Sequence, residues 1–283
     1  MENLEPWRDF TYQNFLSRYA HHIHQQKTHF DPVLGCEDTS YEEIFSEDCL
    51  RDVVSSTVRV TVSYALPRHL FVGSGAKTSV TTEGKPDWAG GNRNKRENGK
   101  SKPLIIGDDK YCWPHKQAIA IVQRTQGEYD QDSYTNILGP LEQVQYYGKR
   151  NNCRYVALQS EGALILFRLR LSNELGRTSP RPNRNARRVP GHQRGLSIST
   201  MSEVVSSTSD VSVPSSIVQL AAHVSAMEYA IIPWEGRRED GMTMKLALYC
   251  IALLANEGND LRSEYEPLGP HLLAPEIRLA SDF

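Results

Sequence analysis

Three residues with complementary chemistry, Asp87, Asp108 and Lys110, lie in the first half of the sequence. Asp87 follows a proline, whereas Asp108 and Lys110 follow the apolar run 104–106 and a glycine. Carboxylate oxygens are the ligands that Mg²⁺ and Mn²⁺ prefer. A lysine beside them can orient an attacking water or stabilise the negative charge that builds up on a phosphate. These residue types in this order indicate metal-dependent hydrolysis of a phosphodiester.

The arrangement of these residues depends on two strands. Residues at positions i and i+2 of a strand project from the same face, so we expect Asp108 and Lys110 to point one way and Asp109 the other. If the segment that ends at Asp87 pairs with the strand of Asp108 as a hairpin, both carboxylates can reach one cation. The backbone carbonyl of Asp109 is then available as a further ligand. The alternative is two turn aspartates and a lysine that forms a salt bridge.

The rest of the chain predicts the helices and strands that would position these residues. Apolar residues at helical spacing predict helices over residues 12–19, 40–54, 116–122, 136–147 and 242–255. β-Branched and alternating apolar residues predict strands over residues 58–64, 70–73, 77–82, 103–106, 154–158 and 163–169, with a short extended segment at 228–235. Residues 89–102 are polar and rich in Gly, Asn and Lys, so we expect a mobile hairpin loop there.

The helix over residues 40–54 has a start signal in the sequence. Ser40 can cap it, and Glu43 at the third position completes a capping box. The apolar residues expected to face the core are Ile44, Phe45, Leu50, Val53 and Val54.

Composition divides the chain into a core and less compact segments. An apolar fraction of 39% over 283 residues is enough for one large domain, placed at residues 40–256, but is low for a chain packed throughout. Residues 1–39 are predicted to be a helical extension, and residues 257–283 a tail on the surface. Residues 172–213 are rich in Ser, Thr, Pro and Arg, which predicts a disordered insertion within the domain.

This insertion carries a local cluster of positive charge. Its arginines are Arg177, Arg181, Arg184, Arg187, Arg188 and Arg194. A basic arm over residues 177–194 can contact phosphates, and the alternative is a solvated linker. The formal charge of the chain is −2, so any surface that binds nucleic acid must be local.

The sequence also limits the compartment and the class of protein. Its five cysteines are scattered and show no zinc-ligand spacing. The N-terminus lacks the basic and apolar regions of a signal peptide, and the apolar run at residues 246–255 is too short to span a bilayer. We therefore expect an intracellular protein of the nucleus or cytoplasm, without a membrane partner.

The order of these segments resembles the PD-(D/E)xK nuclease superfamily and, more narrowly, the fungal PD-(D/E)xK nuclease-like domain proteins. The resemblance rests on Pro86-Asp87, on 104–110 (LIIGDDK), on 140–147 (PLEQVQYY) with Arg154-Tyr155, and on 232–235 (IPWE) with 246–249 (LALY). It implies an α/β (α+β) protein with a restriction-endonuclease-like core. In such a core a central mixed β-sheet is flanked by helices in the order α-β-β-β-α-β.

The same resemblance implies roles for the central residues. Asp87 and Asp108, with the backbone carbonyl of Asp109, would bind Mg²⁺ or Mn²⁺, and Lys110 would be the catalytic lysine. Gln143 matches a glutamine that many superfamily members place beside the site. Its side-chain amide can bond a phosphate or the attacking water, or can serve helix packing instead.

Many superfamily nucleases add a glutamate from the first core helix to the metal site. Glu47 is the first candidate for that ligand here, and Glu43 is the second. The expected function is Mg²⁺-dependent hydrolysis of nucleic-acid phosphodiester bonds, with DNA as the expected substrate. The alternatives are a catalytically inactive nuclease-fold module that binds nucleic acid or a protein partner, and a purely structural interaction domain.

Overall fold

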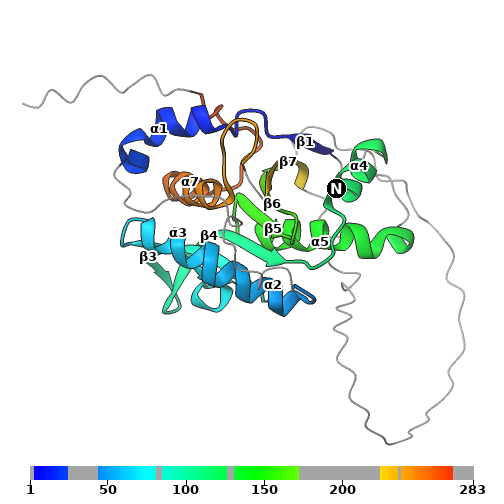
Figure 1. Cartoon of the computed structure of the whole chain (residues 1–283), viewed down its shortest axis with the longest axis horizontal. Coiled ribbons are helices and arrows are strands. Elements are labelled where there is room, and N and C mark those ends of the chain that lie inside the picture. The colour runs from blue at the N-terminus through cyan, green and yellow to red at the C-terminus, as the bar shows by residue number, and fades with distance from the viewer. Residues whose placement is uncertain are drawn as a thin grey trace, which may run out of the picture.

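A seven-stranded mixed β-sheet forms the centre of the protein (Figure 1). The computed structural model describes residues 3–24, 44–80, 85–125, 131–171, 224–234 and 237–269. The strands within these ranges are β1 (Asn3–Pro6), β2 (Leu70–Ser74), β3 (Trp88–Glu97), β4 (Lys100–Asp109), β5 (Tyr155–Gln159), β6 (Ala163–Leu171) and β7 (Val224–Pro233). Their order across the sheet is β1-β7-β6-β5-β4-β3-β2.

Most neighbouring strands in this sheet are antiparallel. The parallel pairs are β1 with β7 and β4 with β5. Because parallel neighbours need a long crossover, β4 and β5 are joined through the helices α4 and α5. The sheet is therefore mixed, as the resemblance implies.

The helices that connect the strands along the chain pack on the two faces of the sheet. They are α1 (Tyr12–His24), α2 (Glu47–Val54), α3 (Val60–Ala65), α4 (His115–Thr125), α5 (Gln131–Arg150) and α7 (Met244–Glu257). A π-helical turn, η2 (Ser55–Arg59), joins α2 to α3, and a short 3₁₀ turn, η3 (Gly75–Lys77), follows β2.

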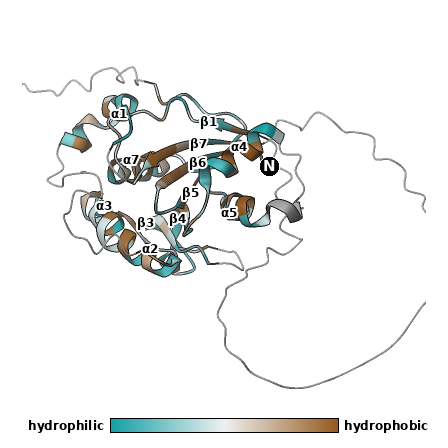
Figure 2. Ribbon diagram, turned by 45° about the vertical axis from the view of Figure 1, so that its right-hand side comes forward, coloured by the Kyte–Doolittle hydropathy of each residue, from teal (hydrophilic) through white to brown (hydrophobic). Residues whose placement is uncertain are grey.

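The two faces of the sheet support separate hydrophobic cores. Along β6, Leu164 and Leu166 enter the core shared with α1, α2, α3 and α7, whereas Ile165 and Phe167 enter the core shared with α4 and α5. Side chains of a strand alternate between faces, so each central strand supplies both cores. Figure 2 shows α7 and the central strands as the most hydrophobic elements. The result is a three-layer α/β/α arrangement.

Several predicted elements are confirmed. Helices predicted at residues 12–19, 116–122, 136–147 and 242–255 correspond to α1, α4, α5 and α7. Strands predicted at 70–73, 103–106 and 163–169 lie within β2, β4 and β6, the strand predicted at 154–158 overlaps β5, and the extended segment at 228–235 lies largely within β7. β1 is an unpredicted strand inside the predicted helical extension, and it joins the central sheet.

The strand predicted over residues 58–64 is wrong. These residues continue the helical turns of η2 and α3. Leu50, Val54, Val58 and Val62 recur every fourth residue and are all buried, which is the spacing of one helix face. This packing outweighs the preference of β-branched residues for strands.

The loop predicted over residues 89–102 is also wrong. This segment forms most of β3 and the beginning of β4, joined at Asn98 and Gly99. Both residues have positive φ angles of 52° and 77°, which is the backbone of a tight two-residue hairpin turn. Backbone hydrogen bonds across the hairpin do not require apolar side chains, so the polar composition conceals the strands.

Two further predictions need correction. No strand covers 77–80: Lys77 ends the 3₁₀ turn, and Thr78 makes only an isolated bridge to Ser101; residues 81 and 82 lie outside the described ranges. The helix expected from residue 40 begins at Glu47 instead, because the Ser46 side chain accepts a hydrogen bond from the backbone N–H of Cys49 and caps the helix there.

One further prediction near the start of α2 is wrong, and three others concern residues that the structure does not describe. Phe45 precedes the helix and is 67% exposed, so the expectation that it faces the core is wrong. The proposed cap Ser40, the second-choice ligand Glu43 and the insertion at residues 172–213 lie outside the described residues.

Candidate functional site

Asp87 and Asp108 meet where β3 begins and β4 ends. Trp88 pairs with Gly107 in the β3–β4 ladder, which places the preceding Asp87 beside the following Asp108. The backbone N–H of Asp87 donates to Asp108 Oδ1 (3.4 Å), and the backbone N–H of Asp109 donates to Asp87 Oδ2 (2.9 Å). The hairpin therefore brings the two predicted ligand carboxylates together.

Lys110 points to the same side as Asp108. Its Nζ lies 2.8 Å from Asp108 Oδ2 and 3.7 Å from Glu47 Oε2. Glu47 comes from the first turn of α2, directly after the capping Ser46. The structure thus gathers Glu47, Asp87, Asp108 and Lys110 at one end of β4.

Asp109 enters a different environment from its neighbour. Its side chain is 0% exposed and forms an ion pair with the buried Arg59 of η2. Arg51 Nε lies 3.8 Å from the same carboxylate. The side chain of Asp109 is thus held by two arginines rather than by Lys110, and the metal role of its backbone carbonyl stays a prediction.

Arg51 is a member of the site that sequence reasoning missed. Its guanidinium lies 2.6 Å from Asp87 Oδ1, 2.7 Å from Asp48 Oδ1 and 3.6 Å from Glu47 Oε1. Burial lowers the pKa of Arg51, but Asp87, Asp109 and the other carboxylates outweigh that effect and raise it. The i, i+4 spacing from Glu47 could have placed Arg51 on the same helix face. Nothing in the local sequence pattern indicated that Arg51 contacts Asp87.

Gln143 lies on α5, the helix that covers the Asp108 side of the sheet. Its Nε2 donates to the hydroxyl of the buried Tyr147 (2.8 Å). Burial raises the pKa of Tyr147, and the nearby charges of Asp108 and Asp87 act in the same direction. Gln143 therefore contacts a tyrosine that senses the charges of the cluster, and its contact with a phosphate or water stays a prediction.

Burial dominates the electrostatics of the cluster. It raises the pKa of Asp108 to about 7, against the opposing charge of Lys110. It also raises the pKa of Asp109 to about 6, against Arg59, and raises that of Glu47. For Lys110, burial lowers the pKa, but Asp108 and Glu47 outweigh it and the net shift is upward. Such buried, mutually charged groups are typical of functional sites.

The carboxylates of Asp87 and Asp108 offer suitable donors for a divalent cation. In this structure, however, they contact the side-chain cations of Arg51 and Lys110 instead. The described residues contain no group of three or more His, Cys, Asp or Glu side chains arranged to hold a metal. Asp108 Oδ2 is nevertheless buried without a well-directed hydrogen bond, despite the nearby Lys110. A hard cation suits these oxygens, provided that Arg51 moves away from Asp87.

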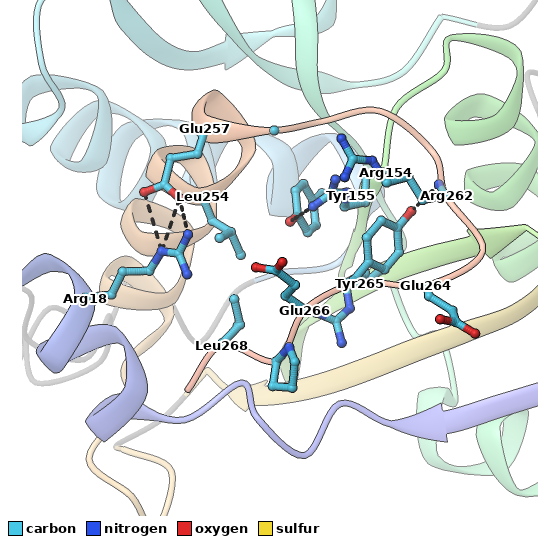
Figure 3. Close-up of a pocket in the computed structure, with 13 residues that line it drawn as sticks. Arg18, Arg154, Tyr155, Leu254, Glu257, Arg262, Glu264, Tyr265, Glu266 and Leu268 are labelled. Carbon is cyan, nitrogen blue, oxygen red and sulfur yellow. Dashed lines mark hydrogen bonds and ion pairs between the residues drawn. The ribbon is translucent and has the colours of Figure 1, made fainter. Parts of the chain in front are cut away.

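A separate cavity of about 310 Å³ lies at the other end of β5 and is lined by the segment that follows α7 (Figure 3). In its lining, Arg18 forms an ion pair with Glu257, and the Arg154 guanidinium lies 4.1 Å from the ring centre of Tyr265. The ring of Tyr265, whose hydroxyl donates to the backbone carbonyl of Leu169 in β6 (2.8 Å), holds the segment after α7 against the sheet. The cavity is remote from Asp109, which lies beside the end of β5.

Comparison of the chain with protein-family models, with curated proteins and with solved structures gave no match. In the part of the chain that the structure describes, no helix is long and apolar enough to cross a membrane. The feature that points to a function is therefore the carboxylate cluster at the end of β4.

Proposed function

We propose that this protein is a Mg²⁺-dependent nuclease of the PD-(D/E)xK type that hydrolyses phosphodiester bonds, with DNA as its substrate. The observation that carries the proposal is the convergence of Glu47, Asp87, Asp108 and Lys110 from α2, the start of β3 and the end of β4. Loops and strand ends on a rigid sheet are suited to hold such groups.

In this proposal, Asp87 and Asp108 hold the cation, and Glu47, which approaches Lys110 (3.7 Å), is the candidate for a third ligand. The bound cation supplies charge neutralisation at the phosphate and a water of lowered pKa. Lys110, held by Asp108 and Glu47, stabilises negative charge or orients the water. Gln143 is assigned a positioning role, because its amide holds the hydroxyl of Tyr147, whose pKa responds to the charges of Asp108 and Asp87.

Labelled single- and double-stranded DNA and RNA, incubated with the purified chain and Mg²⁺ or Mn²⁺, test this proposal. Cleavage is expected to require the metal, to stop on chelation and to fall at least about 100-fold in Asp108→Asn. Asp52→Asn is the matched control, because Asp52 is an exposed acid of α2. Intact substrates under all these conditions would show that the chain is not a nuclease.

The second candidate is a catalytically inactive nuclease-fold module that binds nucleic acid. The 2.6 Å contact between Arg51 and Asp87 favours it, since the arginine supplies a positive charge where the metal would bind. This candidate predicts binding of nucleic acid without cleavage and without measurable Mn²⁺ affinity. Titration calorimetry with Mn²⁺ on the wild type and Asp87→Ala separates the two candidates.

A further inference from the structure

The β3–β4 hairpin carries a groove with a strongly basic lining. The groove has a volume of about 450 Å³, and its charged lining residues among those described are Lys77, Arg93, Arg96 and Lys100. We call this surface the hairpin groove. It departs from the near-neutral balance of the whole chain, so it is a local region of positive potential.

The cations of the hairpin groove differ in how they are held. Arg93 donates to the backbone carbonyl of Leu70 (2.7 Å), and its guanidinium lies 5.2 Å from the ring centre of Phe71. It therefore forms a fixed wall of the groove. Arg96 Nε donates to the backbone carbonyl of Arg93 (3.2 Å), and all four cations, Arg93 included, have exposed side chains.

The acid nearest in sequence is Glu97, which lies opposite Lys100 in the β3–β4 ladder. Glu97 accepts a hydrogen bond from the Ser79 hydroxyl (3.4 Å) and does not line the groove. Within the described ranges, no salt bridge involves Lys77, Arg96 or Lys100. Three exposed cations without a carboxylate partner there fit an anionic ligand.

The distribution of charge favours a repeating anion over a single small one. Lys77 comes from η3, Arg96 from β3 and Lys100 from β4, so three separate elements supply the cations that line this open groove. A nucleic-acid backbone presents a phosphate at every nucleotide and binds to such spaced cations through release of counterions.

The hairpin also connects the groove to the carboxylate cluster. β4 begins at Lys100 and ends at Asp109, a path of at most about 33 Å for ten extended residues. In addition, the backbone N–H of Gly75, which begins η3, donates to the carbonyl of Asp87 (3.2 Å). At about 3.4 Å per base pair, a duplex of roughly ten base pairs can cover this path.

We propose that the hairpin groove binds the phosphodiester backbone of nucleic acid and leads the strand toward Asp87 and Asp108. The direction toward the carboxylates depends on the proposed nuclease function, whereas the binding itself does not. The interaction is sequence-independent, because phosphate contacts carry no base information.

The test compares two triple variants of the full chain. Lys77→Gln/Arg96→Gln/Lys100→Gln removes the exposed cations of the groove, and Lys116→Gln/Arg124→Gln/Arg150→Gln removes exposed cations on α4 and α5. Fluorescence anisotropy with a labelled duplex of about 20 base pairs, at several salt concentrations and with chelator present, measures binding without cleavage. Parallel titrations use single-stranded DNA, RNA and phosphatidylserine vesicles.

The groove variant is expected to bind nucleic acid at least about tenfold more weakly, and the slope of log affinity against log salt should decrease by about 2 to 3. The control variant should change little. Single substitutions Arg96→Gln and Lys100→Gln should each reduce the slope by about 1, which tests the groove even if the triple variant folds poorly.

Unchanged affinity in the groove variants, or an equal loss in the control variant, would overturn the inference. So would a loss restricted to vesicles, or no nucleic-acid binding by the wild type. If the groove variant loses binding but the wild type never cleaves nucleic acid, the groove inference stands and the nuclease proposal falls. If the wild type cleaves nucleic acid and the groove variant binds it normally, the nuclease proposal stands and the groove inference falls.

Discussion

The indole of Trp88 lies against the backbone of Gly107, its partner across the β3–β4 ladder, so closely that a Cβ on Gly107 would fall 2.0 Å from the ring. The next residues along the two strands are Asp87 and Asp108. The glycine therefore allows a large, buried aromatic residue at the ladder position next to the carboxylate pair.

Substitution Gly107→Ala should destabilise the protein by about 1 to 3 kcal/mol, because the added methyl group overpacks the site at Trp88. Urea denaturation measures the free energy of unfolding. Trp88→Leu makes room, so the alanine should cost less in that background than in the wild type. Equal costs in both backgrounds would show that the Trp88 contact is not the cause.

Substitution Arg59→Met should cost about 3 to 5 kcal/mol, since it leaves the fully buried Asp109 carboxylate without its main partner. Thermal and urea unfolding check this value. The double variant Arg59→Met/Asp109→Asn removes the charge that lost its partner and should recover a large part of the stability. No recovery would mean that Arg59 acts mainly through its stacking on Trp88 (5.1 Å).

Substitution Arg51→Met should raise the affinity for Mn²⁺ by about tenfold, because the arginine no longer competes for Asp87 Oδ1. Titration calorimetry measures the affinity, and Arg124→Met is the control on an exposed arginine of α4. The same affinity in Arg51→Met and wild type would contradict competition at this carboxylate.

The stability of the protein should depend on pH through Asp108. Burial raises its pKa to about 7 in the folded chain, above the value of about 3.9 expected in the unfolded chain. The folded state then binds the proton more tightly, so the free energy of unfolding falls as the pH rises from about 4 to about 7.

Asp108→Asn should lack this component, which has a maximum slope of about 1.4 kcal/mol per pH unit for one proton. Unfolding curves of the wild type, Asp108→Asn and the exposed control Asp52→Asn, recorded across this range without metal, measure the difference. Parallel pH profiles in wild type and Asp108→Asn would assign the dependence to other groups, such as Asp109.

Much of the site was predictable from local rules. Alternation along a strand places Asp108 and Lys110 together, and the structure shows their ion pair at 2.8 Å. The first-helix acid Glu47 also reaches the cluster. The apolar runs of β5, β6 and α7 were readable because their burial requires hydrophobic residues regardless of what they contact.

The sequence by itself thus determined the α/β class, the central helices and strands, and the types of residue gathered at Asp87, Asp108 and Lys110. Only the tertiary structure decided the helical state of 58–64 and the strands hidden in 89–102, since core packing and cross-strand hydrogen bonds select those states.

Only the tertiary structure decided which residues pair with the buried charged side chains. Arg59 and Asp109 are fifty residues apart in the chain, and Arg51 reaches Asp87 from a different element. No local pattern encodes such pairs, because each arises only when α2 and η2 pack across the ends of β3 and β4. The physical reason is that a buried charge must find its counter-charge in space, whatever the separation in sequence.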